Sequence, residues 1–377
     1  MRKNKVFSTG WRITLLHLFI CLFLASCNYD SKYYNPDTFV IVKRPQQFKQ
    51  LKSEKILKID NGNVLDLCCT NQYLIVTTNT PSQFIRIYDL ATDSLVSSFG
   101  EFGNAANEFE DYITHHYVRY DSNGEALLYV IDCKGLLTKV IDIEESIKRG
   151  CCVLRKTNKH PIELSGMEWR NYYIDSDRIA FFKEVSFVGP RDCLYNPPAF
   201  GVYNSEMNTT KDLFPNLINN DSINVILGAY STLSCLSPTS THIVGMMKFI
   251  DVITIMDLST LKTIGLRGKD SYDFSFLESN VNKSNLTSEL RLYNVDICAG
   301  EDCFYVLKEN GKTIDELSES KRAMPYVGHI YAYNREGNIV DSYTISEELL
   351  SIAYSSSYKK LFGVDENGLI YKYDFSK

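Results

Sequence analysis

Residues 84–99, FIRIYDLATDSLVSSF, carry the pattern that decides the fold of this chain. Apolar and polar side chains alternate with a period of about two on both sides of Asp89, as they do in β-strands. An Asp at a strand end can accept a hydrogen bond from its own backbone two residues on, and so start a tight turn. The stretch therefore predicts an antiparallel β-hairpin.

The same pattern recurs along the rest of the chain: an apolar strand ending in Asp or Asn, a short polar turn and a second strand. The five further copies are LTKVIDIEESI (137–147), FGVYNSEMNTTKDLF (200–214), VITIMDLSTLKTI (252–264), HIYAYNREGNIVDSYTI (329–345) and LIYKYDFSK (369–377). The turn residues Asp89, Asp142, Asn204, Asp257, Asn334 and Asp374 follow one another at spacings of 53, 62, 53, 77 and 40 residues. Six hairpins at a repeating interval indicate a repeat architecture.

Two more strands are expected ahead of several hairpins. They are Val64–Leu67 and Tyr73–Thr77, Tyr230–Leu233 and His242–Met247, Leu292–Ile297 and Cys303–Leu307, and Leu350–Tyr354 and Lys360–Val364. Short helices are expected near 274–277 and 313–322, inside long loops. The fold class is therefore all-β: a six-bladed β-propeller of four-stranded antiparallel blades over residues 51–377. A β-sandwich or a pair of barrels is the alternative.

The sixth hairpin is truncated, because the sequence stops soon after Asp374 with no outermost strand. An additional strand, Lys55–Ile59, lies near the start of the chain without a blade of its own. We expect it to supply the missing strand and close the ring between the two ends of the propeller.

The first residues predict export. The apolar run at 13–24 follows four basic residues: Arg2, Lys3, Lys5 and Arg12. No acidic residue occurs before Asp30. A positive segment followed by a largely apolar run of twelve residues is typical of a secretory signal peptide, and such a run is too short to span a bilayer of about 30 Å.

The run ends in Leu24-Ala25-Ser26-Cys27, which resembles the lipobox of bacterial lipoproteins. We expect a lipoprotein signal peptide at 1–26, lipid attachment at Cys27 with a membrane as partner, and a tether at 27–50. Two or more acyl chains would make this a stable anchor. The expected location is the cell envelope, at the outer membrane, with the periplasmic or surface face left open. An ordinary secretory signal with a chance cysteine is the alternative.

Composition limits the partners of the exported chain. Without the four basic residues of the signal, 36 Lys and Arg stand against 46 Asp and Glu, a net charge of −10. An acidic body argues against nucleic acid, whose phosphates select basic proteins. No basic cluster for lipid headgroups stands out, and no apolar run after residue 27 is long enough to span a membrane.

The cysteines of the exported chain give one possible bridge. Nine remain besides Cys21 and Cys27, so at least one has no intramolecular partner. Cys298 and Cys303 flank a predicted turn and either form a disulfide across it or are two small buried hydrophobes. No second cysteine pair has metal-ligand spacing, so neither a metal site nor a cofactor is expected.

Two stretches resemble the TolB-like six-bladed propeller lipoproteins of the Bacteroidetes. One is GEFGNAANEF (100–109), where family members often carry a glycine-rich segment ending in Glu-Phe; here Ala-Ala-Asn replaces the usual Gly-Pro-Gly. The other is residues 292–374, which follow the order of the family's last two blades. The resemblance implies a propeller in the cell envelope and does not imply a reaction.

Ligands of propellers usually bind beside the central channel, and segments that precede the innermost strands are expected to open there. The candidate ligand-binding residues are Glu108, Asp111, His115, Glu168, Arg170, Arg291 and Tyr293. His115 and His116 would alternate faces on a strand, so at most one should reach the channel. For Glu108, a bond to its own loop backbone is the competing interpretation.

No catalytic residues are predicted. The sequence has no Gly-x-Ser-x-Gly elbow and no phosphate-cradling glycine loop. The first functional hypothesis is a lipid-anchored binding module for a protein or glycan partner. The alternative is a propeller enzyme, resembling a lactonase or polysaccharide lyase, with its site in the central funnel. A structural or sensory accessory role is a third possibility.

Overall fold

The computed structural model describes most of the chain after residue 33. The described residues are 34–60, 63–111, 113, 115–132, 137–159, 169–175, 178–183, 200–204, 210–211, 232–269, 291–313 and 328–376. The expected signal peptide, Cys27, Glu168 and the two expected short helices lie outside them. Within these residues no helix is long and apolar enough to cross a membrane.

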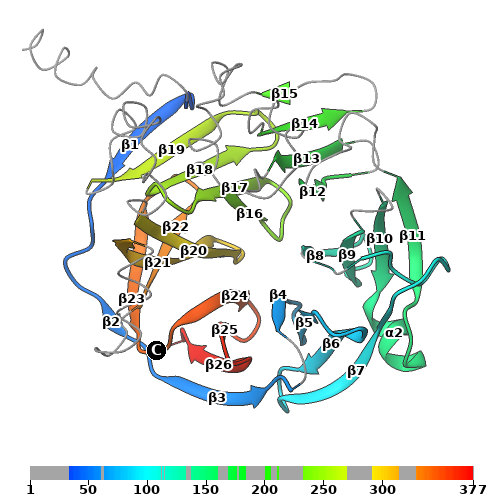
Figure 1. The fold of residues 1–377 in the computed structure, drawn as a ribbon. Helices are drawn as coiled ribbons and strands as arrows, with labels where there is room; N and C mark the ends of the chain where they lie inside the picture. The colour runs from blue at the N-terminus through cyan, green and yellow to red at the C-terminus, as the bar shows by residue number, and fades with distance from the viewer. Residues whose placement is uncertain are drawn as a thin grey trace, which may run out of the picture.

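The described strands form six small sheets in a β-propeller arrangement, with the sheets side by side around a central axis (Figure 1). The first three sheets contain β4 (Val64–Cys69), β5 (Tyr73–Thr78), β6 (Ser82–Asp89) and β7 (Ser94–Glu101); β8 (His116–Tyr120), β9 (Ala126–Asp132), β10 (Leu137–Asp142) and β11 (Leu154–Lys159); and β12 (Trp169–Tyr173), β13 (Arg178–Lys183), β14 (Phe200–Asn204) and β15 (Thr210–Lys211).

The other three sheets include strands from the start of the chain. The fourth contains β16 (Thr232–Leu236), β17 (His242–Met247), β18 (Val252–Asp257), β19 (Thr263–Gly268) and β1 (Thr38–Val42). The fifth contains β20 (Arg291–Ala299), β21 (Cys303–Thr313), β22 (Gly328–Asn334), β23 (Ile339–Ile345) and β2 (Lys49–Gln50). The sixth contains β24 (Leu349–Ser355), β25 (Lys360–Asp365), β26 (Leu369–Asp374) and β3 (Ser53–Lys58).

The turn chemistry expected from the repeat is present where it can be followed. The Asp89 carboxylate accepts hydrogen bonds from the backbone N–H groups of Ala91 and Thr92, both at 2.9 Å, between β6 and β7. Asp257 accepts from Ser259 at 2.8 Å in the same way. These carboxylates satisfy the backbone groups that the reversal of the chain leaves unpaired.

The antiparallel pair expected at Asp142 is present as β10 and β11, but the tight turn and the second strand expected directly after Asp142 are wrong. Asp142 instead caps helix α2 (Ile143–Arg149), accepting a hydrogen bond from the Glu145 N–H at 3.0 Å. Gly150 ends the helix at a φ of 64°, and the outer strand β11 begins only at Leu154. An Asp N-cap and a left-handed Gly C-cap favour a helical turn over a second strand.

The expected closing strand is present. β3 pairs antiparallel with β26, with Leu57 opposite Ile370. Residues from the two ends of the chain thus share the sixth sheet. That sheet packs against the first in one apolar cluster, which includes Phe362, Val364 and Ile370 on one side and Leu74 and Val76 on the other.

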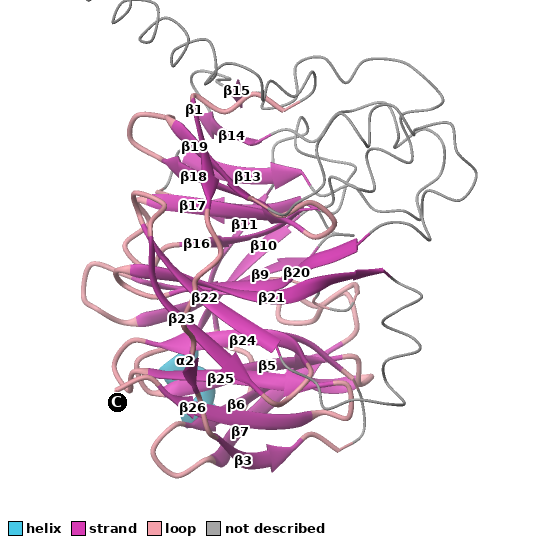
Figure 2. Cartoon of the chain, turned by 90° about the vertical axis from the view of Figure 1, so that its left-hand side faces the viewer, coloured by secondary structure: helices cyan, strands magenta, loops and turns pink. Residues whose placement is uncertain are grey.

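The segment expected to be a tether is partly built into the sheets. β1 pairs in parallel with β19, and β2 pairs in parallel with β23. Tyr34 is 3% exposed, and its hydroxyl lies 2.6 Å from that of Thr254 on β18. We call residues 34–58 the strap, because they follow the outer edges of the fourth, fifth and sixth sheets (Figures 1 and 2).

Candidate functional site

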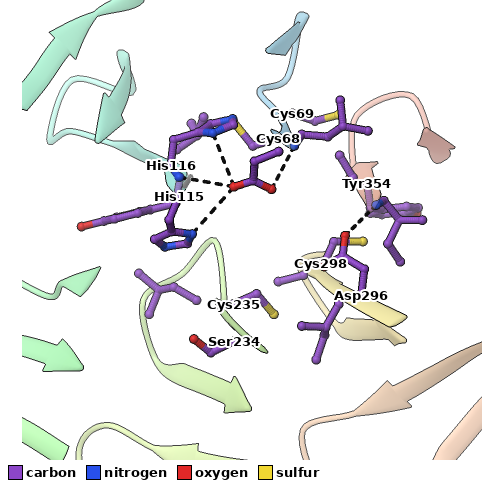
Figure 3. Close-up of a pocket in the computed structure, with 18 of the residues that line it drawn as sticks. Cys68, Cys69, His115, His116, Ser234, Cys235, Asp296, Cys298 and Tyr354 are labelled. Atoms are coloured by element: carbon purple, nitrogen blue, oxygen red, sulfur yellow. Dashed lines mark hydrogen bonds and ion pairs between the residues drawn. The ribbon is translucent and has the colours of Figure 1, made fainter. Parts of the chain in front are cut away.

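Six strands lie nearest the axis, and we call them the inner strands: β4, β8, β12, β16, β20 and β24 (Figure 1). These inner strands surround a central channel with a cavity of about 100 Å³ (Figure 3). Its lining includes residues from all six inner strands or their starts: Asp66, Cys68, Cys69, His115, His116, Tyr117, Tyr172, Ser234, Cys235, Asp296, Cys298, Ile352 and Tyr354. Apolar and polar groups contribute to this wall together.

Asp66, in the middle of inner strand β4, joins the first sheet to the second. Its Oδ2 accepts a hydrogen bond from the His116 N–H at 3.3 Å and lies 3.4 Å from Nδ1 of the His116 ring. The His115 Nδ1 lies 3.7 Å from the same oxygen. Both residues contribute to the wall of the channel. The His116 ring is fully buried, with its Nδ1 3.5 Å from the Thr77 hydroxyl on β5.

Asp296, on β20, makes the equivalent junction between the fifth and sixth sheets. Its Oδ2 accepts from the Ile352 N–H at 2.7 Å and from the Ser351 hydroxyl at 2.8 Å. In both junctions the carboxylate accepts a hydrogen bond from a backbone N–H at the next inner strand, of His116 or Ile352. It also lies close to the side chain of the residue that precedes this N–H in the sequence, His115 or Ser351. Buried carboxylates are stable when they are hydrogen-bonded in this way. The two aspartates have a clear structural role.

Tyrosines make the junctions on either side of the third sheet. The Tyr172 hydroxyl donates to the Ser234 carbonyl oxygen at 2.6 Å, and the Tyr117 hydroxyl accepts from the Tyr173 N–H at 2.7 Å. Burial raises the pKa of Tyr117 well above its usual value. This hydroxyl stays protonated at neutral pH and serves as a hydrogen-bonding group.

Four thiols face the channel: Cys68, Cys69, Cys235 and Cys298. Burial raises the pKa of Cys68, Cys69 and Cys298. A thiol is nucleophilic as its thiolate, which burial disfavours. Within the described part of the chain, no group of three or more His, Cys, Asp and Glu side chains is arranged to hold a metal ion.

The channel opens into a wider mouth of about 390 Å³. The two cavities share five lining residues: Cys69, Val118, Pro238, Ala299 and Tyr354. The mouth lies where the inner strands end, and turn residues complete it: Thr70, Asn71, Thr239, Glu301, Asp302, Arg335 and Ser356, with Tyr120 from the end of β8. A narrow throat therefore leads from a polar entrance.

Hydrogen bonds between neighbouring turns shape the mouth. The Arg335 guanidinium reaches from the turn after β22 and donates to the Glu301 carbonyl oxygen at 2.6 Å. The Tyr120 hydroxyl accepts from the Asn71 N–H at 2.8 Å, and the Ser357 hydroxyl donates to the Asn71 side chain at 2.7 Å. Glu301 and Asp302 are exposed, so acidic groups and one arginine face the entrance together.

Of the residues expected at the funnel whose side chains the structure describes, only His115 lines the channel or its mouth. Asp111 is half-buried ahead of β8, and Arg291 and Tyr293 lie at the start of β20. The side chain of Arg170, on β12, lies outside the described residues, as does Glu168 altogether. The residues that line both cavities lie near the ends of the inner strands, whereas most of the expected residues lie before these strands begin.

Glu108 bonds its own loop, as the competing interpretation held. Its Oε2 accepts from the Ala105 N–H at 2.8 Å, and its carbonyl oxygen accepts from the Lys139 ammonium. Lys139 forms a buried ion pair with Asp132 at 3.0 Å and lies 4.5 Å from the centre of the Phe109 ring. The GEFGNAANEF stretch is therefore a packed connection between the first and second sheets.

The disulfide considered for Cys298 and Cys303 is not formed. Both are free thiols. The register pairs Cys298 with Tyr305 and Cys303 with Asn334, while Gly300 donates to the Cys303 carbonyl oxygen at 2.8 Å. The two cysteines are therefore not opposite each other across the turn, and the alternative of small, mostly buried side chains fits them better.

Sequence reasoning missed most of the channel and all of its mouth. One signal was available: Asp66-Leu67-Cys68 and Asp296-Ile297-Cys298 both place a carboxylate inside an apolar inner strand. An Asp in a buried strand needs hydrogen-bond donors, which points to a junction or a site. The mouth residues lie in turns and carry no comparable signal.

Comparison with known proteins supports the fold. No family model and no curated protein matches this chain. Among solved structures, the chain is similar to the crystal structure of a member of the DUF4221 family from Bacteroides vulgatus, with a TM-score of 0.53 and 12% sequence identity. The match covers 87% of this chain and 98% of that one. At this identity the similarity shows a shared fold alone.

Proposed function

We propose that the protein is a binding module that captures one partner protein at the mouth of its channel. The observation that carries this proposal is the pair of adjoining cavities, an entrance of about 390 Å³ and a throat of about 100 Å³, which share five lining residues. Pockets that bind small groups combine an apolar interior with a few placed polar groups. A projecting loop of a partner fits this shape, with one side chain in the throat.

Charges at the mouth supply specificity. Glu301, Asp302 and Arg335 surround the entrance, and the Arg335 guanidinium is bonded to the Glu301 carbonyl oxygen in the rim. Exposed charges at an interface select partners by complementarity and speed their encounter. The loop of the partner therefore carries a basic residue that meets the two carboxylates.

Enzymatic turnover is the less favoured function. The carboxylates of Asp66 and Asp296 join neighbouring inner strands, and burial keeps three channel thiols protonated. These groups are therefore engaged in holding the fold. A glycan remains the second candidate ligand, because Tyr120 and Tyr354 give the mouth aromatic surface.

Photo-crosslinking tests the binding site directly. A photoreactive residue at Thr239 or Ser356, in the mouth, should capture a discrete protein in cells; the same residue at Lys159, on the outer strand β11, should not. Asp302→Lys should weaken capture from Thr239 at least tenfold. Equal capture from all three positions, or capture of glycan only, would contradict the proposal.

Anchoring and blade number belong to the same proposal. The lipobox at Leu24–Cys27 supports a lipid anchor in the cell envelope, and the six sheets with their closing strand support a six-bladed ring of the TolB-like type. An alkyne analogue of palmitate should label the protein. Cys27→Ala should remove the label, whereas Cys21→Ala should keep it because the signal is cleaved off.

A further inference from the structure

The strap carries an unusual concentration of positive charge. Between residues 43 and 58 it contains six basic residues and one acidic residue, Glu54, although the chain as a whole is acidic. The basic residues are Lys43, Arg44, Lys49, Lys52, Lys55 and Lys58, and all six are exposed. The sequence alone did not indicate a basic cluster, because these residues are spaced along sixteen positions.

The fold turns this spacing into a surface. β2 lies on the outer edge of the fifth sheet and β3 on that of the sixth, so the basic residues follow one side of the rim (Figure 2). The strap is fixed there: Gln47 accepts from the Ser342 hydroxyl at 2.8 Å, and the Leu51 N–H donates to the Thr344 carbonyl oxygen at 3.0 Å. The backbone of the strap is therefore held against the rim.

Nearby acidic groups leave most of this charge uncompensated. Asp341 pairs with Lys49 at 2.5 Å, and the Glu54 carboxylate lies 3.4 Å from the Lys372 ammonium. Glu347 accepts hydrogen bonds from the Ser53 and Tyr373 hydroxyls. Among the described contacts, Lys43, Lys52, Lys55 and Lys58 have no ion pair.

Exposed apolar residues adjoin the basic ones. Val40 and Ile41, on β1, are 40% and 39% exposed, and Val340 on β23 is 52% exposed. A surface that combines lysines with a few exposed aliphatic side chains matches the boundary between lipid headgroups and acyl chains. An acidic protein partner would match the lysines alone.

We propose that the strap side of the rim lies on an anionic phospholipid surface. Polybasic segments beside a membrane anchor are attracted to anionic lipids, and one such patch adds to the hold of an acyl chain. The geometry also rests on the proposed lipid at Cys27. From Cys27 to Tyr34 the chain can extend at most about 25 Å. Because Tyr34 is fixed to β18 through Thr254, a lipid on Cys27 would keep the start of the strap close to the membrane.

Lysine acetylation of the lipidated protein in vesicles tests the orientation. On vesicles containing phosphatidylglycerol, Lys43, Lys52, Lys55 and Lys58 should be acetylated at least fivefold more slowly than on phosphatidylcholine vesicles. Lys148, Lys156 and Lys159, which are exposed near the outer edge of the second sheet, should react equally on both. High salt should remove the protection, because it screens exposed charges.

Charge reversal provides the matched control. The triple variant Lys43→Glu, Lys52→Glu, Lys55→Glu should lose the protection of Lys58, while Lys148→Glu, Lys156→Glu, Lys159→Glu should keep it. Equal acetylation of the strap lysines on both vesicle types would overturn the proposal, as would protection of both lysine sets. Recovery of protein with the vesicles reports the lipid anchor separately, and partner capture at the mouth is unaffected by either result.

Discussion

At the scale of single residues, the channel depends on two carboxylates. Asp296 is 8% exposed, and one oxygen accepts both the Ile352 N–H and the Ser351 hydroxyl. Asp296→Ala leaves a buried N–H without its acceptor, which costs about 1–3 kcal/mol. We expect this loss in the free energy of urea unfolding at pH 7. Asp302→Ala, at an exposed turn, should change it by less than about 0.5 kcal/mol. If both variants lost the same free energy of unfolding, the stabilising role of Asp296 between the fifth and sixth sheets would be refuted.

The sequence shows which residues are unusual but not what they contact. Asp66 and Asp296 stand out because each interrupts an apolar strand. Their partners lie 50 and 56 residues away and are mainly backbone N–H groups, which have no sequence signature. The mouth depends even more on the assembled ring, since Tyr120 of the second sheet and Ser357 of the sixth both bond Asn71 of the first. Local patterns cannot predict contacts of this kind.

At the scale of elements, the strap has a pH-sensitive contact. Phe48 lies 4.6 Å from the His329 ring, between ring centres. Burial, together with the nearby charges of Arg44 and Lys308, lowers the pKa of His329 from 6.5 to about 4. The folded protein therefore favours the neutral imidazole, and this contribution to stability is complete above pH 6.5.

We expect that contribution to be lost as the pH falls from 6.5 towards 4, since the unfolded chain then binds the proton more readily. The loss should be on the order of 1–3 kcal/mol, because each unit of pKa shift corresponds to about 1.4 kcal/mol. His329→Gln removes the titrating group, so its free energy of unfolding should vary less with pH over this range. Carboxylates titrate equally in the wild type and the variant, so any difference between the two curves of unfolding free energy against pH reports His329. Parallel curves would disprove the role of His329.

Most elements could be predicted from periodicity, and the exceptions have physical causes. At Asp142 the same residue type that starts a hairpin elsewhere caps a helix instead, because Glu145 and Gly150 complete helical caps. Residues 38–42, TFVIV, are strand-like in composition, but their partner β19 lies more than 200 residues away. Parallel pairing at such a distance leaves no local pattern in the sequence.

At the scale of the whole molecule, the closing strand joins the two ends of the propeller. Ile370 of β26 and Ile59, which follows β3, belong to the apolar cluster that holds the sixth sheet against the first. The sixth sheet is also packed against the fifth through Leu349, Ile352 and Leu361. Loss of β3 would therefore expose an edge and weaken a contact between neighbouring sheets at once.

Leu57→Pro tests whether this closure stabilises the ring as a whole. Proline at the centre of β3, opposite Ile370, removes a backbone donor and disfavours the strand. Leu57→Val keeps the backbone and should cost less than about 1.5 kcal/mol. If closure stabilises the whole ring, Leu57→Pro should speed amide hydrogen exchange in every sheet, and urea should unfold the variant in one step at a lower midpoint. Faster exchange confined to β26 would instead show that the other five sheets hold together without it, because each buries its faces against its neighbours.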